Sequence, residues 1–533
     1  MSKYIFVTGG VTSSIGKGIT AASLGKLLVE RGLRVNVQKF SPNLNVDTDR
    51  LNPVLHGEVF VTEDGGEVDL DIGHYERFLD SNFRKNCNYT AGKIYSSIFE
   101  RERREEFLGS TISVVPHLTS EIKAMMKSAG SSENDIVIVE VGGTVGDIET
   151  DVFLESIRQF ERELRPGNYI HIHCTLVPYI KSTNEAKTKP TQHSVQALNS
   201  KGLFPDIIIA RTDSEVELNG QCRKKIAGFC NLPSVDCVIH NPECDNMYEV
   251  PLNLASQGLD RVVCELLNFN TQPINLKKWQ DMIDLYNMDL PIMDIAIVGK
   301  YTEVSDSYIS ITEAIKHAGL KNRYKVKISV ISSEDIEMMG AKEVLKNYDG
   351  VVIPGGFGVR GTEGMIQTAK YCREHKVPYL GISFGMQIAV IEFARNVAGL
   401  KDANSTEFGP TNNPVIDVMS DVKGKVEKNG IMRLGNYNCH LMDDTIARRL
   451  YGLTDTKERH RNVFEFNNAY REDFESRGMV FSGINPEKDL VEIIEYKDHP
   501  FFVGTLFQPE FKSRPNRPHP IYLGFISEII KSK

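Results

Sequence analysis

Short apolar runs alternate with helical stretches along this chain, and this alternation constrains its fold more than any other feature. The run Tyr4–Thr8 is followed by a glycine-rich turn and then by a helical pattern from about Ile19 to Arg31. Such alternation is typical of a parallel sheet with helices on both faces. The expected strands of this first sheet are Tyr4–Thr8, Arg34–Lys39, Asp135–Val141, Tyr169–Val177 and Asp206–Ala210.

The alternation is interrupted once and then begins again. Asn268 to Pro291 is polar and contains the only tryptophan, Trp279, and we interpret it as a linker with a short helix. At 533 residues the chain is too long for one ordinary core. We therefore predict two doubly wound α/β domains, at residues 1–267 and 292–533, joined by a linker at 268–291. The elements expected in the second are strands at Asp294–Val298, Lys325–Ile331, Val351–Pro354 and Tyr379–Ser383, and a helix near Ser307–Ala318.

Composition and charge exclude several classes of protein. The net charge is −9 and the isoelectric point about 5.9, which argues against binding nucleic acid through bulk charge. No apolar run approaches the roughly 18 residues of a membrane span, and the first residues lack the pattern of a signal peptide. The nine cysteines show no CxxC spacing, so we expect reduced thiols in a cytoplasmic protein.

The turn after the first strand predicts a phosphate-binding loop. It runs from Gly9 to Gly18 and contains Lys17. A glycine-rich turn between a strand and a helix presents backbone N–H groups and the positive end of the helix dipole to phosphate. The match to the standard phosphate-loop pattern is imperfect, because there is one extra residue and Gly18 replaces the Ser or Thr that holds magnesium. A purely structural turn is the alternative.

Two carboxylates are candidate magnesium ligands. Asp71 lies in a dense acidic stretch, and Glu140 follows an apolar run, so that it is expected at the carboxyl edge of the sheet, where ligands bind in such folds. Magnesium takes one or two carboxylates together with phosphate oxygens. The alternative for each residue is a solvated surface charge, which the preceding apolar run makes a poorer explanation for Glu140.

An ordered set of motifs resembles the CTP synthase family over nearly the whole chain. The set is TGGVTSSIGKG near the N-terminus, His56 to Phe78, GGTVGDIE from Gly142, KTKPTQHS from Lys187, PGGFGVRG, NSTEF and PEFKSRP. That family makes CTP from UTP: ATP phosphorylates the uracil O4 atom, and ammonia then displaces the phosphate.

The resemblance implies a role for each matching residue. The residues implied for ATP are Ser14, Ile15, Gly16, Lys17, Gly18, Ile19 and Asp71, with Lys17 and Lys39 acting on the phosphates as catalytic residues. Asp71 and Glu140 would hold Mg²⁺. The residues implied for UTP, and for CTP as an inhibitor, are Ser13, Asp147, Ile148, Glu149, Lys187, Lys189, Gln192 and Lys225. Clustered lysines such as Lys187 and Lys189 are otherwise read as solvated charge.

The first half also departs from the family pattern. Where the family reads K-x-D-P-Y-x-N, this chain has Ser41 in place of the carboxylate and Asn43 in place of the aromatic residue. A serine cannot carry the negative charge of a carboxylate. The stretch expected at adenine is also altered, to Pro242-Glu243-Cys244. These changes are compatible with a slow enzyme, a changed substrate or no turnover.

The second domain resembles the class I glutamine amidotransferases, in which a cysteine on a sharp strand-to-helix turn is activated by a histidine that a glutamate orients. Here the nucleophile position is Ser383, and the family's His-Pro-Glu reads Gln508-Pro509-Glu510. The arginine that binds the glutamine α-carboxylate falls at Val463; Arg461, in a different register, is the candidate for a partial replacement. Glu407 and the Gly355-Gly356 turn expected at the oxyanion hole are retained. We therefore expect a degenerate glutaminase site.

The Gly-x-Ser-x-Gly spacing around Ser383 is also that of the nucleophile elbow of serine hydrolases. Such an enzyme needs a general base, and four downstream histidines are candidates: His440, His460, His499 and His519.

Three functional hypotheses remain. The first is a ligase that aminates UTP, or a close analogue, with free ammonia. The second is a non-catalytic regulator or assembly partner of a CTP synthase, and the third is a paralogue that uses another amine or nucleotide. The resemblance further implies a homotetramer, in some members filaments. Arg360 is retained in a loop that resembles the family's GTP-responsive lid.

Overall fold

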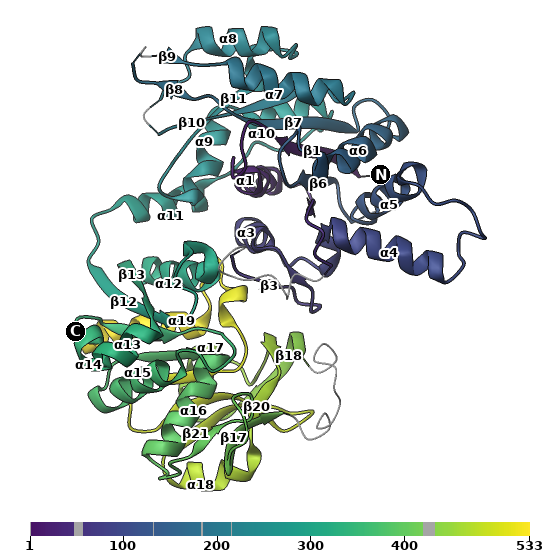
Figure 1. The fold of residues 1–533 in the computed structure, drawn as a ribbon. Coiled ribbons are helices and arrows are strands. Elements are labelled where there is room, and N and C mark those ends of the chain that lie inside the picture. Colours follow the sequence, from purple (N-terminus) through teal and green to yellow (C-terminus); the bar gives the residue numbers. More distant parts are fainter. Residues whose placement is uncertain (1, 47–56, 132, 183–184, 215, 419–431) are drawn as a thin grey trace. The chain divides into compact units, whose positions relative to one another are not determined.

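The computed structural model describes residues 2–46, 57–131, 133–182, 185–214, 216–418 and 432–533. The described residues form two compact units (Figure 1). The first contains residues up to 50 and 71–283, and the second contains 51–70 and 284–533. Of the sequence motifs, only His56 lies outside the described residues.

A seven-stranded parallel sheet forms the centre of the first unit, in the order β11-β10-β7-β1-β6-β2-β5. The prediction of a parallel sheet is confirmed. Its strands are β1 (Lys3–Gly9), β2 (Val35–Ser41), β5 (Asn88–Thr90), β6 (Ile136–Val141), β7 (Tyr169–Leu176), β10 (Ile207–Thr212) and β11 (Val238–Pro242). A small hairpin joins β8 (Tyr179–Ile180) to β9 (Glu185–Ala186).

Helices cover both faces of this sheet, because successive side chains of a strand point to opposite faces. Tyr4 and Phe6 of β1 pack in one core with α4, α5, α6 and α7, whereas α1 packs across β1, β2 and β6 and against α9 and α10. The helices are α1 (Lys17–Glu30), α3 (Leu70–Leu79), α4 (Ala91–Arg103), α5 (Thr119–Ser128), α6 (Asp151–Glu163), α7 (Lys189–Ser200), α8 (Gly220–Phe229), α9 (Val250–Ser256), α10 (Leu259–Leu266) and α11 (Lys277–Asn287).

The second unit is built on a nine-stranded sheet in the order β13-β12-β14-β15-β23-β22-β21-β18-β19. The first five strands are parallel, and the other four are antiparallel. The strands are β12 (Ile292–Gly299), β13 (Lys325–Ser332), β14 (Gly350–Ile353), β15 (Tyr379–Ile382), β18 (Arg433–Leu441), β19 (Asp455–Asn462), β21 (Met479–Asn485), β22 (Leu490–Tyr496) and β23 (Phe502–Thr505). A three-stranded sheet joins β16 (Ala403–Ser405), β17 (Asn413–Val418) and β20 (Phe464–Phe466).

Two cores lie on the two faces of the nine-stranded sheet. One holds side chains of α13 to α16, and the other holds side chains of α12, α17 and α19. The helices are α12 (Ile309–Lys321), α13 (Ser333–Met339), α14 (Ala341–Leu345), α15 (Thr362–His375), α16 (Phe384–Asn396), α17 (Ile446–Tyr451), α18 (Arg471–Ser476) and α19 (Pro520–Ser532). Helices on both faces of the sheet agree with the expected α/β class. The antiparallel strands extend the parallel part of the sheet.

A hairpin from the first 70 residues belongs to the second unit. It comprises β3 (Phe60–Val61) and β4 (Glu67–Val68). Arg459 donates from Nη1 to the Val61 carbonyl, at 3.1 Å, and Asn436 donates its N–H to the Glu63 carbonyl, at 2.9 Å. From the sequence we expected each domain to be one continuous segment, at 1–267 and 292–533. In the structure, residues 57–70 group with the second unit instead of the first. Pairing between such distant segments leaves no periodic signal in the sequence.

All nine cysteines are free thiols. No helix among the described residues is both long and apolar enough to cross a membrane.

Candidate functional site

The glycine-rich loop connects β1 to α1 and begins the first candidate site. Gly16, the residue before α1, has a φ of +83°, which a glycine adopts without strain. Ser14 also has a positive φ, of 55°. Lys17 is buried at the start of α1, and its Nζ donates to the Gly143 carbonyl, at 2.8 Å. A Cβ on Gly9 would lie 2.7 Å from Lys17 Cδ, so glycine lets the lysine pack against the loop.

Four of the predicted residues converge beside this loop. Lys39 of β2 and Glu140 of β6 are register partners on neighbouring strands. Lys39 is ion-paired with Asp71, which lies in the first turn of α3. A Cβ on Gly18 would lie 2.5 Å from Asp71 Oδ1. The glycine that replaces the usual Ser or Thr therefore leaves room for the Asp71 carboxylate.

The charges of this cluster act on Glu140, which is buried. Burial raises the pKa of the Glu140 carboxyl, the negative charge of Asp71 adds to that rise, and Lys39 and Lys17 oppose it. Tyr75 donates its hydroxyl hydrogen to Glu140 Oε2, at 2.6 Å. The site thus offers two carboxylates and two ammonium groups at the carboxyl edge of the sheet, a donor set that fits a divalent cation carried by phosphates. The part of the chain that is described has no group of three or more His, Cys, Asp or Glu arranged for a metal.

The residues expected to bind the pyrimidine nucleotide lie on segments that follow strands at the same edge of the sheet. Lys189 and Gln192 lie in the first turns of α7, and Gln192 is buried with its Nε2 donating to Thr188 Oγ1, at 3.1 Å. Lys187 is ion-paired with Glu185, at 2.6 Å, and Lys225 acts electrostatically on the same carboxylate. Lys189 and Lys225 are exposed, as are four residues of this set that follow the neighbouring strands β1 and β6: Ser13, Asp147, Ile148 and Glu149.

Two neighbours of this site were missed by the sequence reasoning. Tyr75 is one, and Arg211 of β10 is the other. A Cβ on Gly16 would lie 3.6 Å from Arg211 Nε, and Arg211 Nη1 donates to the carbonyls of Asn241 and Pro242, at 3.4 and 3.3 Å. The altered stretch at Pro242 is thus joined to the loop through Arg211. No local pattern marks either residue, since each is a single polar side chain brought in by the fold.

The second candidate site centres on Ser383, which connects β15 to α16. Its φ of 51° and ψ of −100° are strained for a residue other than glycine. Its N–H donates to the Thr505 carbonyl, at 2.6 Å. The nucleophile-elbow geometry predicted from the Gly-x-Ser-x-Gly spacing is therefore present.

Ser383 lines a cavity of about 100 Å³ in the second unit. Gln508 also lines it; its Nε2 donates to the Arg461 carbonyl, at 3.3 Å, and its buried Oε1 accepts no hydrogen bond from the described residues. Glu510 is buried, and burial raises the pKa of its carboxyl well above the usual value. The lining residues are Glu58, Val59, Tyr301, Ser307, Tyr308, Ile311, Gly355, Gly356, Phe357, Ser383, Arg461, Gln508, Glu510 and Phe511.

The other expected glutaminase residues lie around this cavity without all lining it. Gly355 lines it, whereas Glu407 accepts a hydrogen bond from the Gly358 N–H, at 2.6 Å. Val463 lies half-buried between β19 and β20 and is absent from the cavity lining. Arg461 lines the cavity and donates from Nε to Glu67 Oε1, at 2.7 Å, so its charge is already paired with the hairpin.

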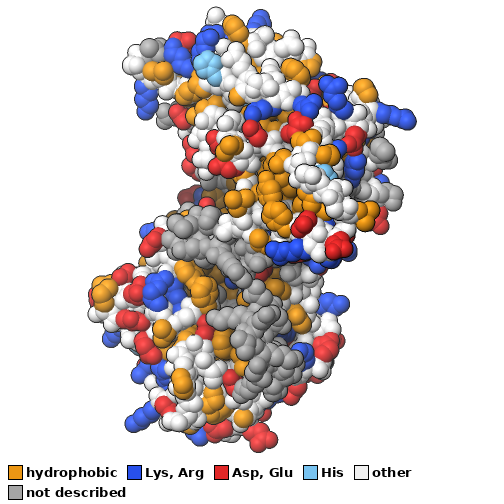
Figure 2. Space-filling model, turned by 45° about the vertical axis from the view of Figure 1, so that its right-hand side comes forward, with side chains coloured by type: hydrophobic (Ala, Val, Ile, Leu, Met, Phe, Trp, Pro, Cys, Tyr) orange, Lys and Arg blue, Asp and Glu red, His pale blue; other side chains and the backbone are white. Residues whose placement is uncertain are grey.

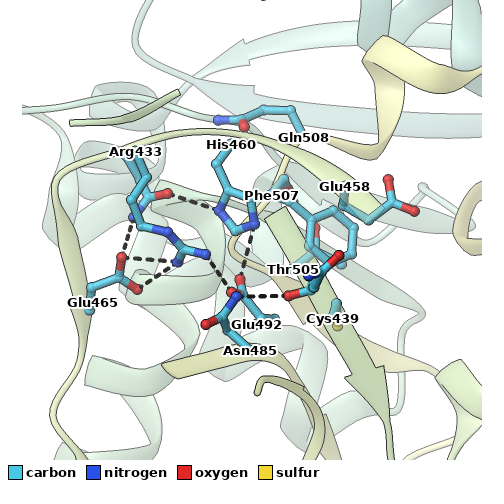
Figure 3. A network of polar contacts seen from close by, with 12 residues as sticks. Arg433, Cys439, Glu458, His460, Glu465, Asn485, Glu492, Thr505, Phe507 and Gln508 are labelled. Atoms are coloured by element: carbon cyan, nitrogen blue, oxygen red, sulfur yellow. Dashed lines mark hydrogen bonds and ion pairs between the residues drawn. The ribbon is translucent and has the colours of Figure 1, made fainter. Parts of the chain in front are cut away.

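A buried polar network next to Gln508 holds one candidate base. His460 Nε2 lies 3.1 Å from Glu492 Oε2, and Nδ1 lies 3.1 Å from Asn462 Oδ1 (Figure 3). Arg433 donates to both Glu492 and Glu465, at 2.6 and 3.1 Å. Burial lowers the pKa of His460 well below its usual value and raises that of Glu492 to about 8. His460 is therefore a neutral member of this network.

The other candidate histidines have partners elsewhere. His499 contacts the Cys372 carbonyl, His519 contacts Glu458, and His440 contacts Asp455. None of the four histidines lines the cavity among the described residues. The structure thus gives no support to a serine hydrolase at Ser383.

Comparison with known proteins places the chain in a family. A model described as "CTP synthase N-terminus" matches residues 3–269. A CTP synthase of Caldanaerobacter subterraneus subsp. tengcongensis is 52% identical over 100% of this chain and 99% of its own length, and one of Carboxydothermus hydrogenoformans is 51% identical with the same coverage. The chain belongs to the CTP synthase family.

The second half of this CTP synthase family member matches a further model. This model, described as "Glutamine amidotransferase class-I", matches residues 303–527, which include Ser383, Gln508 and Glu510. Among solved structures, the glutaminase domain of Trypanosoma brucei CTPS with bound acivicin is 35% identical, with a TM-score of 0.43, and the alignment covers 45% of this chain and 94% of that domain.

Proposed function

We propose that this member of the CTP synthase family is an ATP-dependent ligase that aminates UTP, or a close analogue, to CTP with free ammonia. The γ-phosphoryl group of ATP is transferred to the uracil O4 atom, ammonia attacks C4, and phosphate leaves, so that ADP and phosphate accompany CTP. The convergence of Lys17, Lys39, Asp71 and Glu140 beside a phosphate loop is the observation that supports this most strongly. Phosphoryl transfer requires positioning and charge neutralisation, which these groups provide.

We assign the ATP phosphates to the loop Ser14–Ile19, with Lys17 and Lys39 as catalytic residues. Asp71 and Glu140 would hold Mg²⁺, which when bound neutralises phosphate charge and orients the transferred group. Glu140 fits this role because its carboxyl is buried and feels the negative charge of Asp71, a setting in which a divalent cation compensates the burial of negative charge.

We assign the pyrimidine nucleotide to α7 and the loops beside it. Lys187 is ion-paired with Glu185, and Lys225 acts electrostatically on the same carboxylate; a nucleoside triphosphate is a stronger partner for both ammonium groups. Lys189 and Gln192 follow on α7, and Ser13 and Asp147–Glu149 complete the proposed UTP and CTP contacts.

We propose free ammonia as the amine because the second site lacks the groups that glutamine hydrolysis needs. Ser383 is a weaker acid than a cysteine thiol, and Gln508 cannot accept a proton from it at neutral pH. Val463 supplies no charge for an amino-acid carboxylate. Because groups that act as a unit fail together, we propose that residues 292–533 form a glutaminase-like domain without glutaminase activity. Residues 1–267 would form the synthetase domain, and 268–291 the linker.

We further propose that the protein assembles as a homotetramer in the cytoplasm. An open hollow of about 560 Å³ on α4 is lined by exposed apolar side chains that include Leu44 and Phe99, with 74% and 56% of their surface exposed. Figure 2 shows hydrophobic side chains gathered over part of the first unit, in the upper half of the view. A surface of this kind favours association with another copy.

Formation of CTP from UTP, ATP and magnesium in ammonium chloride tests the proposed reaction. We expect CTP and ADP in equal amounts, with no product when UTP or ATP is omitted. A protein that binds both nucleotides and forms no product would instead be a non-catalytic regulator, the second candidate. The replacement of a carboxylate by Ser41, which is buried at the end of β2, favours that candidate.

A further inference from the structure

Four buried polar side chains form a hydrogen-bonded relay on the α7 face of the first sheet. Ser194 of α7 lies 2.8 Å from His173 Nε2, and His173 Nδ1 lies 2.8 Å from Thr8 Oγ1. Thr8 Oγ1 lies 2.9 Å from His171 Nε2. Thr8 and His173 are register partners on β1 and β7, and all four side chains are more than nine-tenths buried. The relay therefore connects α7 to the centre of the sheet.

The donors and acceptors that these four side chains carry favour one direction of hydrogen-bond donation along the relay. If the Ser194 hydroxyl donates to His173 Nε2, His173 donates from Nδ1 to Thr8, and Thr8 donates to His171 Nε2. The remaining N–H, at His171 Nδ1, then faces Glu161 Oε1 at 3.5 Å, which is an attractive contact. The reverse order would leave the Ser194 hydrogen without an acceptor among the described residues and would point a lone pair of His171 Nδ1 at Glu161. Burial, together with His171 and Lys17, lowers the pKa of His173 to about 3, so the His173 ring is neutral.

The relay ends against the phosphate loop. A Cβ on Gly10 would overlap Ser194 Oγ and would lie 3.1 Å from His173 Nε2. The Gly10 N–H donates to the carbonyl of Cys174, the residue after His173, at 3.0 Å. The first residues of the loop are therefore held between β7 and the Ser194 side chain.

We propose that Ser194 and His173 are positioning residues that fix α7 against the phosphate loop and thereby couple the binding of ATP to that of UTP. The inference rests on the proposed function, in which the loop binds ATP and the first turns of α7 bind UTP. Gln192 lies two residues before Ser194 on α7. A shift of Ser194 therefore moves the proposed UTP contacts and the loop relative to each other.

Ser194→Ala tests this role, because it removes the first donor of the relay and leaves the proposed nucleotide contacts in place. The binding of UTP is measured by calorimetry with magnesium, with and without a non-hydrolysable ATP analogue. We expect the analogue to strengthen UTP binding to the wild-type protein at least about 5-fold, within the usual range of coupling between sites. In Ser194→Ala that enhancement should disappear. Ser200→Ala, an exposed serine at the end of α7, is the matched control and should retain the enhancement.

A kinetic readout separates positioning from stability. With ammonium as the amine, Ser194→Ala should raise the KM for UTP more than it lowers kcat, with a thermal unfolding temperature like that of the control. Ser194→Cys keeps a weak donor and should recover part of the coupling, and it replaces the alanine variant if that variant does not fold.

The outcomes distinguish the inference from the proposed function. A wild-type protein that binds both nucleotides, with coupling that Ser194→Ala retains, overturns the positioning role alone, as does a wild-type protein that binds both without coupling. A wild-type protein that binds neither nucleotide overturns the proposed function, and the positioning role with it.

Discussion

Lys17 is buried, and among the described residues its Nζ has one hydrogen-bond acceptor. Its Nζ donates to the Gly143 carbonyl, and it acts electrostatically on Glu140 and His173. A buried ammonium group retains its charge only where acceptors and anions face it. In the proposed reaction the phosphates of ATP are those anions, and Lys17 is held ready for them.

Lys17→Ala should therefore abolish most CTP formation. We expect kcat/KM with ammonium to fall by about 10²-fold or more, because removing one preorganised donor from a developing charge has that effect in other enzymes. Lys127→Ala, an exposed lysine on α5, should stay within about 2-fold. Equal activity of the two variants in a steady-state CTP assay would remove Lys17 from the catalytic machinery.

Individual residues of the site could be predicted to different degrees. Glu140 was recognisable because an apolar run ends at it, so its place at the sheet edge follows from the strand. Asp71 was a candidate because it lies in a dense acidic stretch, although nothing in that stretch indicates which carboxylate faces Lys39. Tyr75 and Arg211 were missed, because a side chain recruited from another element has no local signal. His460 was a plausible base by residue type, and its burial beside Glu492 is a property of tertiary packing.

The hairpin of β3 and β4 packs with the second unit, although most of that unit lies more than 200 residues later in the sequence. The Phe60 ring lies 4.8 Å from that of Phe511, and Arg459 lies over the Phe60 ring at 5.6 Å. Glu58 accepts a hydrogen bond from the Ser310 hydroxyl and lines the Ser383 cavity with Arg461. The second unit is thus incomplete without residues from the first 70.

Phe60→Ala should destabilise the second unit. The side chain is almost fully buried, and truncating a buried phenylalanine costs about 3–5 kcal/mol. Denaturant unfolding followed by limited proteolysis should show residues 284–533 losing protection first. Phe204→Ala, which removes a ring with 66% of its surface exposed, should change the free energy of unfolding by about 0.5 kcal/mol or less. A Phe60→Ala effect as small as that would mean that the hairpin is not part of the unit.

The network around Arg433 predicts a specific pH dependence of stability. Because the pKa of Glu492 is raised to about 8, the folded state keeps a proton that the unfolded chain releases near pH 4.5. Its stabilising contribution is complete below that pH and is lost as the pH rises through about 8. The lowered pKa of His460 acts in the opposite sense, reducing stability as the pH falls below about 6.5. Charged neighbours of the pair are Arg433, Glu465, Glu458 and Glu487.

Stability should therefore be highest between about pH 4.5 and 6.5 for this pair, and should fall by about 2 kcal/mol from pH 6.5 to 8. Glu492→Gln cannot titrate, so its free energy of unfolding should lose that slope, whereas the exposed control Glu472→Gln should keep it. Urea unfolding across the range measures both. An unchanged slope in Glu492→Gln would place the responsible proton elsewhere.

At the scale of the whole molecule, the sequence pattern was most informative where strands are parallel and fully buried. The runs Asp135–Val141 and Asp294–Val298 predicted β6 and β12, because both faces of each strand are covered by helices. The antiparallel part of the second sheet was not predicted. Strands such as β18 and β19 mix buried and exposed residues, for example the exposed Lys457 beside the buried Glu458, and their pattern is weaker.

The exposed apolar surface of α4 gives a prediction about assembly. Phe99→Asp places a charge in the proposed contact between copies, and burying a charge there is unfavourable. We expect the variant to elute as a smaller species than the wild-type protein in size-exclusion chromatography with light scattering. Phe204→Asp, at an exposed ring that does not line this hollow, is the control. An unchanged mass for Phe99→Asp would exclude this surface from the assembly.

We propose that the first unit is a working ligase and the second an inactive glutaminase. Supplying the amine as ammonium chloride or as glutamine, with UTP, ATP and magnesium held constant, tests both parts in one measurement. We predict CTP with ammonium and none with glutamine. CTP formed equally well from glutamine would contradict the assignment of Ser383 and Gln508 as an inactive pair.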